Sequence, residues 1–479
     1  MPSKTTLNAA SLEGLGVRRL AELLIDISAG NTAARRRLRL ELAAAESAAE
    51  VARLVRERLT TIGRSRAYLD WRKRRDLAAE LEVHRKAIVE RVADSAEALE
   101  LMWQLTELAN PTLARCVDTG ETVMGVFCAA VADLGTIAFD AATDPRKLAD
   151  RAFEAAIRNH YGQYNDLVGV LSPALGQEGL EHLKQRTIEF SNAPLTRPAG
   201  GHGAKTEQQF RGTVHEEEFA ERVRRGTVRL ILQAVADAQG DVDAFIAQHD
   251  EEARKVPVFA ARIGRRLLAA GRAEEALEAI DAGARGDQPD PVWHEFDWED
   301  TRIDVLEALG RRDEAQKMRR RCFELCLSEP HLRAYLKRLP DFEDMEAEER
   351  ALDHALGFDD PLEALSFLLS WPALDRASKL VIERTQEIDG AFHEVLAPAA
   401  DALAAKHSLA ATLVLRAMIE FALGSGRSSR YKRAARHLTD CSALSSNIGE
   451  FREFETHEDF EARLKREHGR KESFWKLIG

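Results

Sequence analysis

Apolar residues recur along this 479-residue chain at the three- and four-residue spacing of an amphipathic α-helix, and no segment shows the two-residue period of a β-strand. Two clear stripes are Leu20, Leu23, Leu24 and Ile27, and Val228, Ile231, Leu232 and Val235. Ala, Leu, Glu and Arg dominate the composition, and all four favour helix. The sequence therefore predicts an all-α fold.

Helix starts are marked by capping residues. Ser47 precedes Glu50 by three positions, the spacing of a capping box, in which the Ser hydroxyl accepts from the Glu amide. Asp144 stands directly before Pro145, and Pro is favoured at the first helical position because the missing N–H has no partner there. We predict a helix that starts after Asp144 and ends at Gly162.

A Pro/Gly-rich stretch, SNAPLTRPAGGHGAKTEQQFRGT at 191–213, interrupts the helical pattern. It contains Gly, Lys and Thr, as a phosphate-binding loop does, but Ala204 separates Gly203 from Lys205 and no strand precedes it. A linker is the better interpretation, and no cofactor is expected. The predicted organisation is an N-terminal helical domain over 1–192, a linker over 193–213 and a C-terminal helical-hairpin array over 214–479.

A Gly and an Ala five residues later recur in the C-terminal part. The pairs are Gly271 with Ala276 and Gly310 with Ala315, and they repeat after 39 residues. Two further pairs, Gly357 with Ala364 and Gly424 with Ala434, have a wider spacing and match the pattern less well. The pattern resembles the tetratricopeptide family, in which Gly closes the first helix of a hairpin and a small Ala lets the second helix pack closely. The resemblance implies an elongated α-solenoid of tetratricopeptide-like hairpins, although the repeat exceeds the ~34 residues of the family.

A second resemblance rests on the segments 159–183, 429–438 and 454–478. They look like those of an uncharacterised family of bacterial all-helical proteins. The C-terminal hairpins of that family are in turn similar to the helical part of SWIM zinc-finger proteins, but the closely spaced Cys and His of the zinc finger are absent here. The resemblance implies a fold and brings no established activity.

Charge is distributed unevenly. The net charge is −12, yet residues 1–75 hold 16 Lys and Arg against 8 Asp and Glu. Arginines with aromatic residues between them suit phosphate contact and base stacking. The candidate residues for binding nucleic acid or a partner are Arg35, Arg36, Arg37, Arg39, Arg64, Arg66, Tyr68, Trp71, Arg72, Lys73, Arg74 and Arg75. In the alternative interpretation, Tyr68 and Trp71 pack inward while the charges pair with Asp70, Asp76 and Glu80.

Two other segments could carry chemistry. In VWHEFDWED, residues 292–300, His294 and Asp297, with Asp300, would share one helical face and could hold a metal ion. The favoured alternative has Trp293 and Trp298 anchoring the next hairpin. Cys322 and Cys326, four residues apart, could form a redox pair or half of a metal site, but two small buried residues at a helix interface are the favoured interpretation.

These observations favour a binding protein over an enzyme. No Ser-His-Asp or Cys-His arrangement is evident, so we expect a non-enzymatic scaffold that binds a protein partner, with nucleic-acid association through the basic clusters as the alternative. Five cysteines fit a reducing compartment, and no unbroken apolar run reaches the ~18 residues of a membrane span. A cytoplasmic location without membrane contact is expected.

Overall fold

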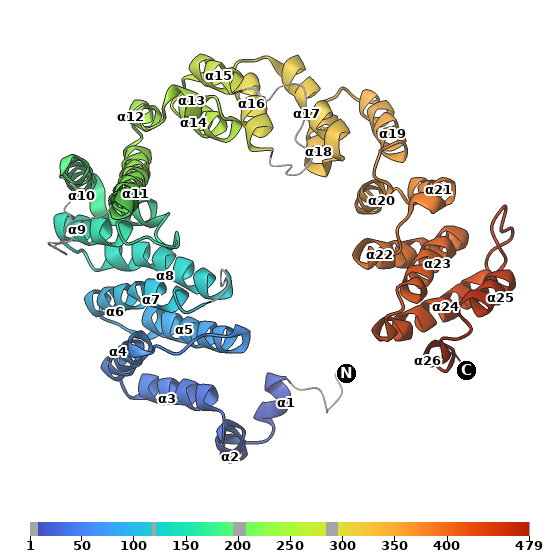
Figure 1. Ribbon diagram of the computed structural model, residues 1–479, viewed down its shortest axis with the longest axis horizontal. Coiled ribbons are helices and arrows are strands. Elements are labelled where there is room, and N and C mark those ends of the chain that lie inside the picture. Colours follow the sequence, from blue (N-terminus) through green and yellow to red (C-terminus); the bar gives the residue numbers. More distant parts are fainter. Residues whose placement is uncertain (1–7, 117–120, 195–206, 284–295, 479) are drawn as a thin grey trace. The chain divides into compact units, whose positions relative to one another are not determined.

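The computed structural model describes residues 8–116, 121–194, 207–283 and 296–478 (Figure 1). Every regular element in these ranges is a helix, and the one β-contact there is an isolated bridge between Leu69 and Cys116. The predicted all-α fold is therefore confirmed. The chain divides into two compact units, Met1–Asp250 and Glu251–Gly479. Of the predicted linker, residues 195–206 lie outside the described residues, and residues 207–213 open a long helix.

Twelve helices are described in the first unit. They are α1 (Ala9–Glu13), α2 (Val17–Ser28), α3 (Thr32–Glu46), α4 (Ala48–Arg64), α5 (Trp71–Arg91), α6 (Ser95–Glu107), α7 (Ala109–Leu113), α8 (Glu121–Asp140), α9 (Pro145–Ala156), α10 (Leu167–Asn192), α11 (Glu207–Gln239) and α12 (Val242–Ala247).

The predicted caps are present. The Ser47 hydroxyl accepts from the amide of Glu50 at 3.2 Å, and one carboxylate oxygen of Asp144 accepts from two amides of the first turn of α9. The end predicted for that helix is wrong. α9 stops at Ala156, and Gly162 lies beyond it with φ +88°, a conformation that glycine adopts without strain. A glycine that follows an apolar stretch can occupy the C-terminal cap of the helix or a turn further along the chain.

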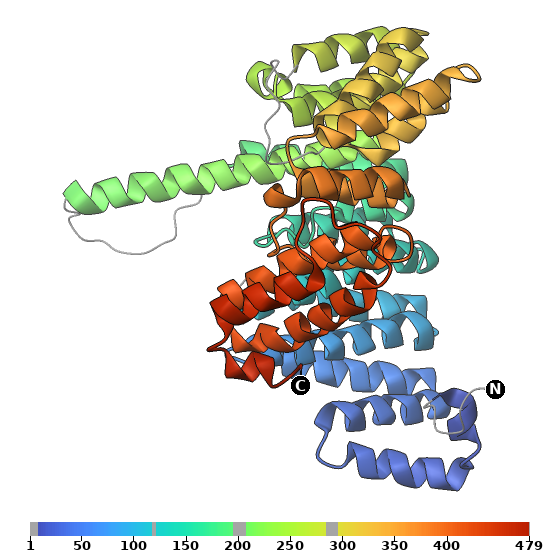
Figure 2. The ribbon, with the colours of Figure 1, turned by 90° about the vertical axis from the view of Figure 1, so that its right-hand side faces the viewer.

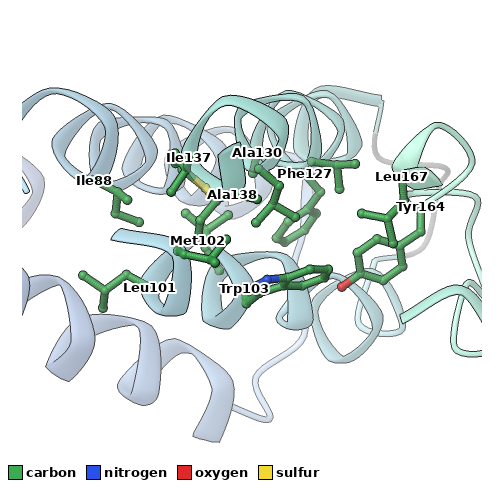
Figure 3. Packing of buried hydrophobic residues seen from close by; sticks show 14 of the residues in the cluster. Ile88, Leu101, Met102, Trp103, Phe127, Ala130, Ile137, Ala138, Tyr164 and Leu167 are labelled. Atoms are coloured by element: carbon green, nitrogen blue, oxygen red, sulfur yellow. The ribbon is translucent and has the colours of Figure 1, made fainter. Parts of the chain in front are cut away.

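Helix α8 lies at the centre of the first core and packs against α5, α6 and α10. Figure 3 shows Phe127, Ala130, Ile137 and Ala138 of α8 facing Met102 and Trp103 of α6, among other core residues. By length and composition alone, Thr122–Asp140 is apolar enough to cross a membrane. In this fold its apolar side chains supply the central layer of the core.

Two long helices complete the first unit. α10 carries Pro173 and bends at Gly176, whose φ of 53° and ψ of −170° are not helical. α11 packs on α10, and it projects beyond the other helices of its unit (Figure 2). Its predicted stripe is confirmed, because Val228, Ile231 and Val235 are buried. The stripe predicted on α2 is only partly covered: Leu20 and Leu23 are half-buried, but Leu24 and Ile27 are exposed.

The second unit contains fourteen described α-helices and two short 3-10 helices. They are α13 (Glu251–Arg254), α14 (Pro257–Ala269), α15 (Ala273–Ala282), α16 (Asp297–Ala308), α17 (Arg312–Cys326), α18 (Glu329–Leu336), α19 (Glu343–Leu356), α20 (Pro361–Ser370), α21 (Leu374–Glu383), η1 (Thr385–Glu387), α22 (His393–Leu403), α23 (Ser408–Gly424), η2 (Ser428–Arg430), α24 (Tyr431–Ser445), α25 (His457–His468) and α26 (Glu472–Trp475).

The recurring glycines close two helical hairpins in the same way. Gly271 ends α14 with φ +75°, and Gly310 ends α16 with φ +73°. In each turn, the amide after the glycine donates to a carbonyl five residues back, at 2.9 and 2.8 Å. Ala276 and Ala315 of the following helices are fully buried. In the last of the looser echoes, Gly426 has the positive φ, and the predicted residue Gly424 lies inside α23.

A buried arginine, Arg416, connects the C-terminal helices to the rest of the second unit through hydrogen bonds. Arg416 of α23 donates to the carbonyls of Glu455 at 2.9 Å and Thr456 at 3.1 Å, directly before α25. Its guanidinium lies 4.5 Å from the centre of the Phe460 ring. The loop before α25 therefore has a fixed attachment to α23.

Candidate functional site

The basic segment, residues 64–75, joins α4 to α5. Arg64 ends α4 and Trp71 opens α5, so the residues between them form a non-helical connection. Within that connection only Leu69 is buried, and its amide donates to the carbonyl of Arg115 at 3.2 Å. Tyr68 and Trp71 are 56% and 62% exposed. The alternative in which these rings pack inward is therefore wrong, because Tyr68 lies outside any helix and Trp71 occupies the first position of one.

One of the predicted cations is held in an internal ion pair. Glu80 of α5 accepts from two nitrogens of Arg58 at 2.6 and 2.9 Å and from Arg36 of α3 at 2.9 Å. Burial of Glu80 acts to raise the pKa of this carboxyl, but the Arg58 hydrogen bond and the charges of both arginines hold the pKa below its ordinary value. This contact brings α3, α4 and α5 together and removes Arg36 from the free basic surface.

The remaining basic side chains lie at the surface of the first unit. Lys73 pairs with Asp70 at 3.2 Å, as predicted, and the Arg72 guanidinium lies 5.0 Å from the centre of the Trp71 ring. Arg74 is half-buried. The exposed cations are Arg35, Arg37, Arg39, Arg64, Arg66, Arg72, Lys73 and Arg75. Exposed cations beside two exposed rings form a surface that can contact phosphates and stack bases.

Two adjoining cavities form a groove along α17, α18 and α19 of the second unit. They have volumes of about 810 and 370 Å³, and Arg320 and Tyr335 line both. Phe323 and Leu332 give the smaller cavity an apolar floor. Charged side chains of both signs line the groove, and they include Arg312, Lys317, Arg338, Glu343, Arg350 and Asp353. Ligand-binding clefts combine an apolar lining with a few polar groups, and the smaller cavity comes nearer to that composition than the larger, mostly charged one. No pattern in the sequence indicates this groove.

The two described residues of the proposed metal site, Asp297 and Asp300, are engaged in other contacts. His294 and Trp293 lie outside the described residues, while Asp297 pairs with Arg265. Trp298 is buried and donates from its indole to the carbonyl of Ile280 at 3.0 Å, which anchors α16 to α15. In the described part of the chain, no group of three or more His, Cys, Asp and Glu side chains could hold a metal ion.

Both cysteines of α17 carry free thiols. Cys322 is buried and Cys326 is half-buried. Burial raises the pKa of Cys322 to about 12 and that of Cys326 to about 11. Thiols with such pKa values are almost wholly protonated at neutral pH and react slowly. Their placement fits the structural interpretation better than a redox pair.

A hydrogen-bonded Ser-His-Asp chain links α16 to α18. The Ser328 hydroxyl lies 2.6 Å from Nδ1 of His331, and Nε2 of His331 lies 2.9 Å from Oδ1 of Asp300. A catalytic triad also needs N–H donors beside the nucleophile to stabilise an oxyanion. Here Pro330 removes one amide of the first turn of α18, and none of the three residues lines a cavity described above. The contacts of Ser328, His331 and Asp300 join α16 to the start of α18.

A cluster of arginine and histidine side chains surrounds a small cavity between α22, α23 and α24. No pattern in the sequence indicates it. The cavity has a volume of about 100 Å³, and its polar lining side chains are His393, Arg430, Arg433 and His437. The two His rings lie 5.8 Å apart, centre to centre. His393 and His437 are distant in the sequence, and no motif around either one marks it as a functional residue.

The described chain thus belongs to the class of all-helical proteins, and its candidate sites are grooves and charged surfaces. The described ranges contain no cluster of side chains that could hold a metal ion. Within that class the chain belongs to the family of unknown function DUF6880, whose model matches residues 2–477. The expected membership of an uncharacterised family is thereby confirmed. A search of the curated proteins found no match.

Proposed function

We propose that this protein is a non-enzymatic scaffold that binds an extended segment of a partner protein in the groove along α17, α18 and α19. The observation that carries the proposal is the groove itself, in which Arg320 and Tyr335 connect two cavities. A connected groove of this kind suits an extended peptide, with apolar side chains on the floor and charges at the rim.

The hairpins closed at Gly271 and Gly310 support a tetratricopeptide-like interpretation of the preceding helices. In such arrays each hairpin buries its apolar face against its neighbours, and the stack presents an extended binding surface. The solenoid arrangement, the similarity to the helical part of SWIM zinc-finger proteins and a cytoplasmic location are parts of the same proposal.

The charges of the groove favour a partner segment that carries both signs. Arg320 pairs with Glu324 at 2.7 Å, and Arg338 pairs with Glu307 at 3.2 Å. Lys317 is exposed and makes no ion pair among the described residues. A partner carboxylate can therefore reach Lys317 without breaking an existing pair.

The test is site-specific photocrosslinking in cells that naturally carry the chain. A benzophenone side chain at position 317 should give a discrete adduct with one protein, because this position lies in the groove. The same side chain at Lys379, an exposed position on α21, is the matched control and should give none. Arg320→Glu should reduce the adduct about tenfold, since it reverses a charge that both cavities share. Equal adducts at both positions, or an adduct unchanged by Arg320→Glu, would refute the groove as the binding site.

A second candidate function is nucleic-acid association through the basic segment. The exposure of Tyr68 and Trp71 beside Arg66 and Arg72 favours it, because exposed rings are available for stacking. Binding of a single-stranded oligonucleotide, measured by fluorescence anisotropy, should weaken as salt increases.

The variant Arg66→Glu/Arg72→Glu/Arg75→Glu should lower the slope of log affinity against log salt by about 2, since three phosphate contacts are lost at ~0.7 each. Arg18→Glu/Arg19→Glu on α2 reverses two charges outside this surface and is the control for charge reversal as such. A slope equal in all three proteins would exclude this surface. A groove adduct that survives nuclease treatment would show that partner binding in the groove does not depend on nucleic acid. That result would separate the two candidate functions.

A further inference from the structure

Arginine and histidine supply all the polar side chains that line the cavity between α22, α23 and α24. Its floor is apolar and includes Met418 and Phe421 of α23, while the four polar side chains are two arginines and two histidines. No carboxylate lines it. The groove along α17–α19, by contrast, is lined by charges of both signs. Burial lowers the pKa of both histidines, so the two arginines supply the positive potential inside this small space.

The arginines of this cavity are not neutralised by neighbouring carboxylates. Arg433 is exposed and makes no hydrogen bond or ion pair within the described residues. Arg430 lies 4.7 Å from the centre of the Phe421 ring and donates to the Ser425 hydroxyl at 3.4 Å, a contact with a neutral group. Both guanidinium groups therefore keep their charge available to a ligand.

His437 has ring nitrogens without a hydrogen-bond partner. Both Nδ1 and Nε2 are buried from solvent, and Nδ1 lies 3.9 Å from Asp440, beyond hydrogen-bond distance. A buried polar atom without a partner destabilises the fold, and such an atom in a native protein points to a missing ligand or a role. The His393 ring faces the same cavity from the first residue of α22.

Local geometry adds to the positive potential. The N-terminus of α22, an 11-residue helix, opens at His393 beside the cavity, and a helix N-terminus favours an anion. Gly390 brings this turn against α23, because a Cβ at this position would overlap the carbonyl oxygen of Ala417. The close approach fixes the distance between His393 and α23.

We propose that this cavity is a binding site for a phosphate group, held by Arg430 and Arg433 with the His393 and His437 rings beside them. Two histidines could also suggest a metal ion, but two unpaired guanidinium groups repel a cation from the same space. The volume equals about three water molecules at ~30 Å³ each, which suits a single tetrahedral anion. The site is independent of the peptide groove proposed above.

The test is calorimetric titration of the full chain with inorganic phosphate and, separately, with phenyl phosphate. One-site saturable binding is expected. Arg433→Gln and Arg430→Gln should each weaken it about tenfold, because each removes a charge-assisted hydrogen bond. Arg436→Gln is the matched control: it removes a charge from the same helix, lies outside the cavity and should change affinity less than about twofold.

The two probes distinguish the sources of the phosphate. Tighter binding of phenyl phosphate would assign a phosphate ester, whose organic part contacts Met418 and Phe421, whereas equal binding would assign the free ion; both results support the site. The proposal is overturned if neither probe binds, or if Arg433→Gln binds phosphate as Arg436→Gln does. Binding of Zn²⁺ that depends on His437, without phosphate binding, would also overturn it.

Discussion

Gly135 of α8 packs directly against the backbone of Val170 in α10: a Cβ at position 135 would lie 2.5 Å from the Val170 carbonyl oxygen. A backbone oxygen cannot rotate away as a side chain can. We expect Gly135→Ala to lower the free energy of unfolding of the first unit by about 2 kcal/mol, because the two helices must separate. Hydrogen exchange of α8 and α10 peptides measures the loss locally.

Gly125 of the same helix is the matched control, since a Cβ there meets nothing within 4 Å. Gly125→Ala should raise stability by about 0.5 kcal/mol, because Ala favours helix over Gly. If both substitutions changed stability in the same direction, the close approach of α8 and α10 would not be what requires glycine at 135.

Glu80 joins three helices, so its removal should destabilise the N-terminal part of the first unit. Glu80→Ala leaves Arg58 half-buried without its bidentate partner, and we expect a loss of about 2 kcal/mol in urea unfolding. Glu57 of α4 pairs only with Arg53 and is 61% exposed, so Glu57→Ala should cost less than about 0.5 kcal/mol. Equal losses in the two variants would contradict this role of Glu80.

Cysteine reactivity should follow burial. Burial raises the pKa of the Cys128, Cys322 and Cys441 thiols, but Cys128 is exposed, whereas the other two are buried and have a pKa of about 12. With iodoacetamide at pH 7.5, mass spectrometry should find Cys128 labelled first and the other two protected until the chain is unfolded in urea. A disulfide between Cys322 and Cys326 under mild oxidant would restore the redox interpretation of this pair.

Stability of the second unit should decrease in mild acid. Burial lowers the pKa values of four of its histidines: His393, His437, His457 and His468. In the unfolded chain these groups return to a pKa of ~6.5, so below that pH the unfolded state binds more protons than the folded state. The free energy of unfolding should therefore fall as pH decreases from 7.5 to 5.5.

His437→Gln tests the assignment, because it removes one group that titrates with a lowered pKa. Urea unfolding of this variant should show a smaller loss between the two pH values than the parent chain shows. An unchanged or larger loss would mean that other groups control the acid sensitivity.

Local features of the fold were predictable because they depend on neighbours in sequence. Asp144 caps α9 through amides two and three residues away. Gly271 and Gly310 close their helices because glycine tolerates positive φ. The end of α9 was not predictable in the same way, since Gly162 had an equally good position in a later turn.

Candidate sites were less predictable, because exposure and proximity depend on packing. The spacing of Tyr68 and Trp71 suits one face of a helix, but that helix starts only at Trp71 and both rings are exposed. The sequence indicates that Arg36 is a free cation, but the packing of α3 against α5 places its guanidinium beside Glu80. The groove at Arg320 and Tyr335 has no sequence signature, since its walls come from separate helices.

The sequence by itself determined that the described chain is helical, where many helices begin and which glycines end two hairpins, because capping and backbone preference act within a few residues. Only the tertiary structure decided which charges are paired, which aromatic rings face solvent, and that His393 and His437 share a cavity with two arginines. Those properties arise when helices distant in sequence pack together, and no local pattern of residues encodes which side chains will then meet.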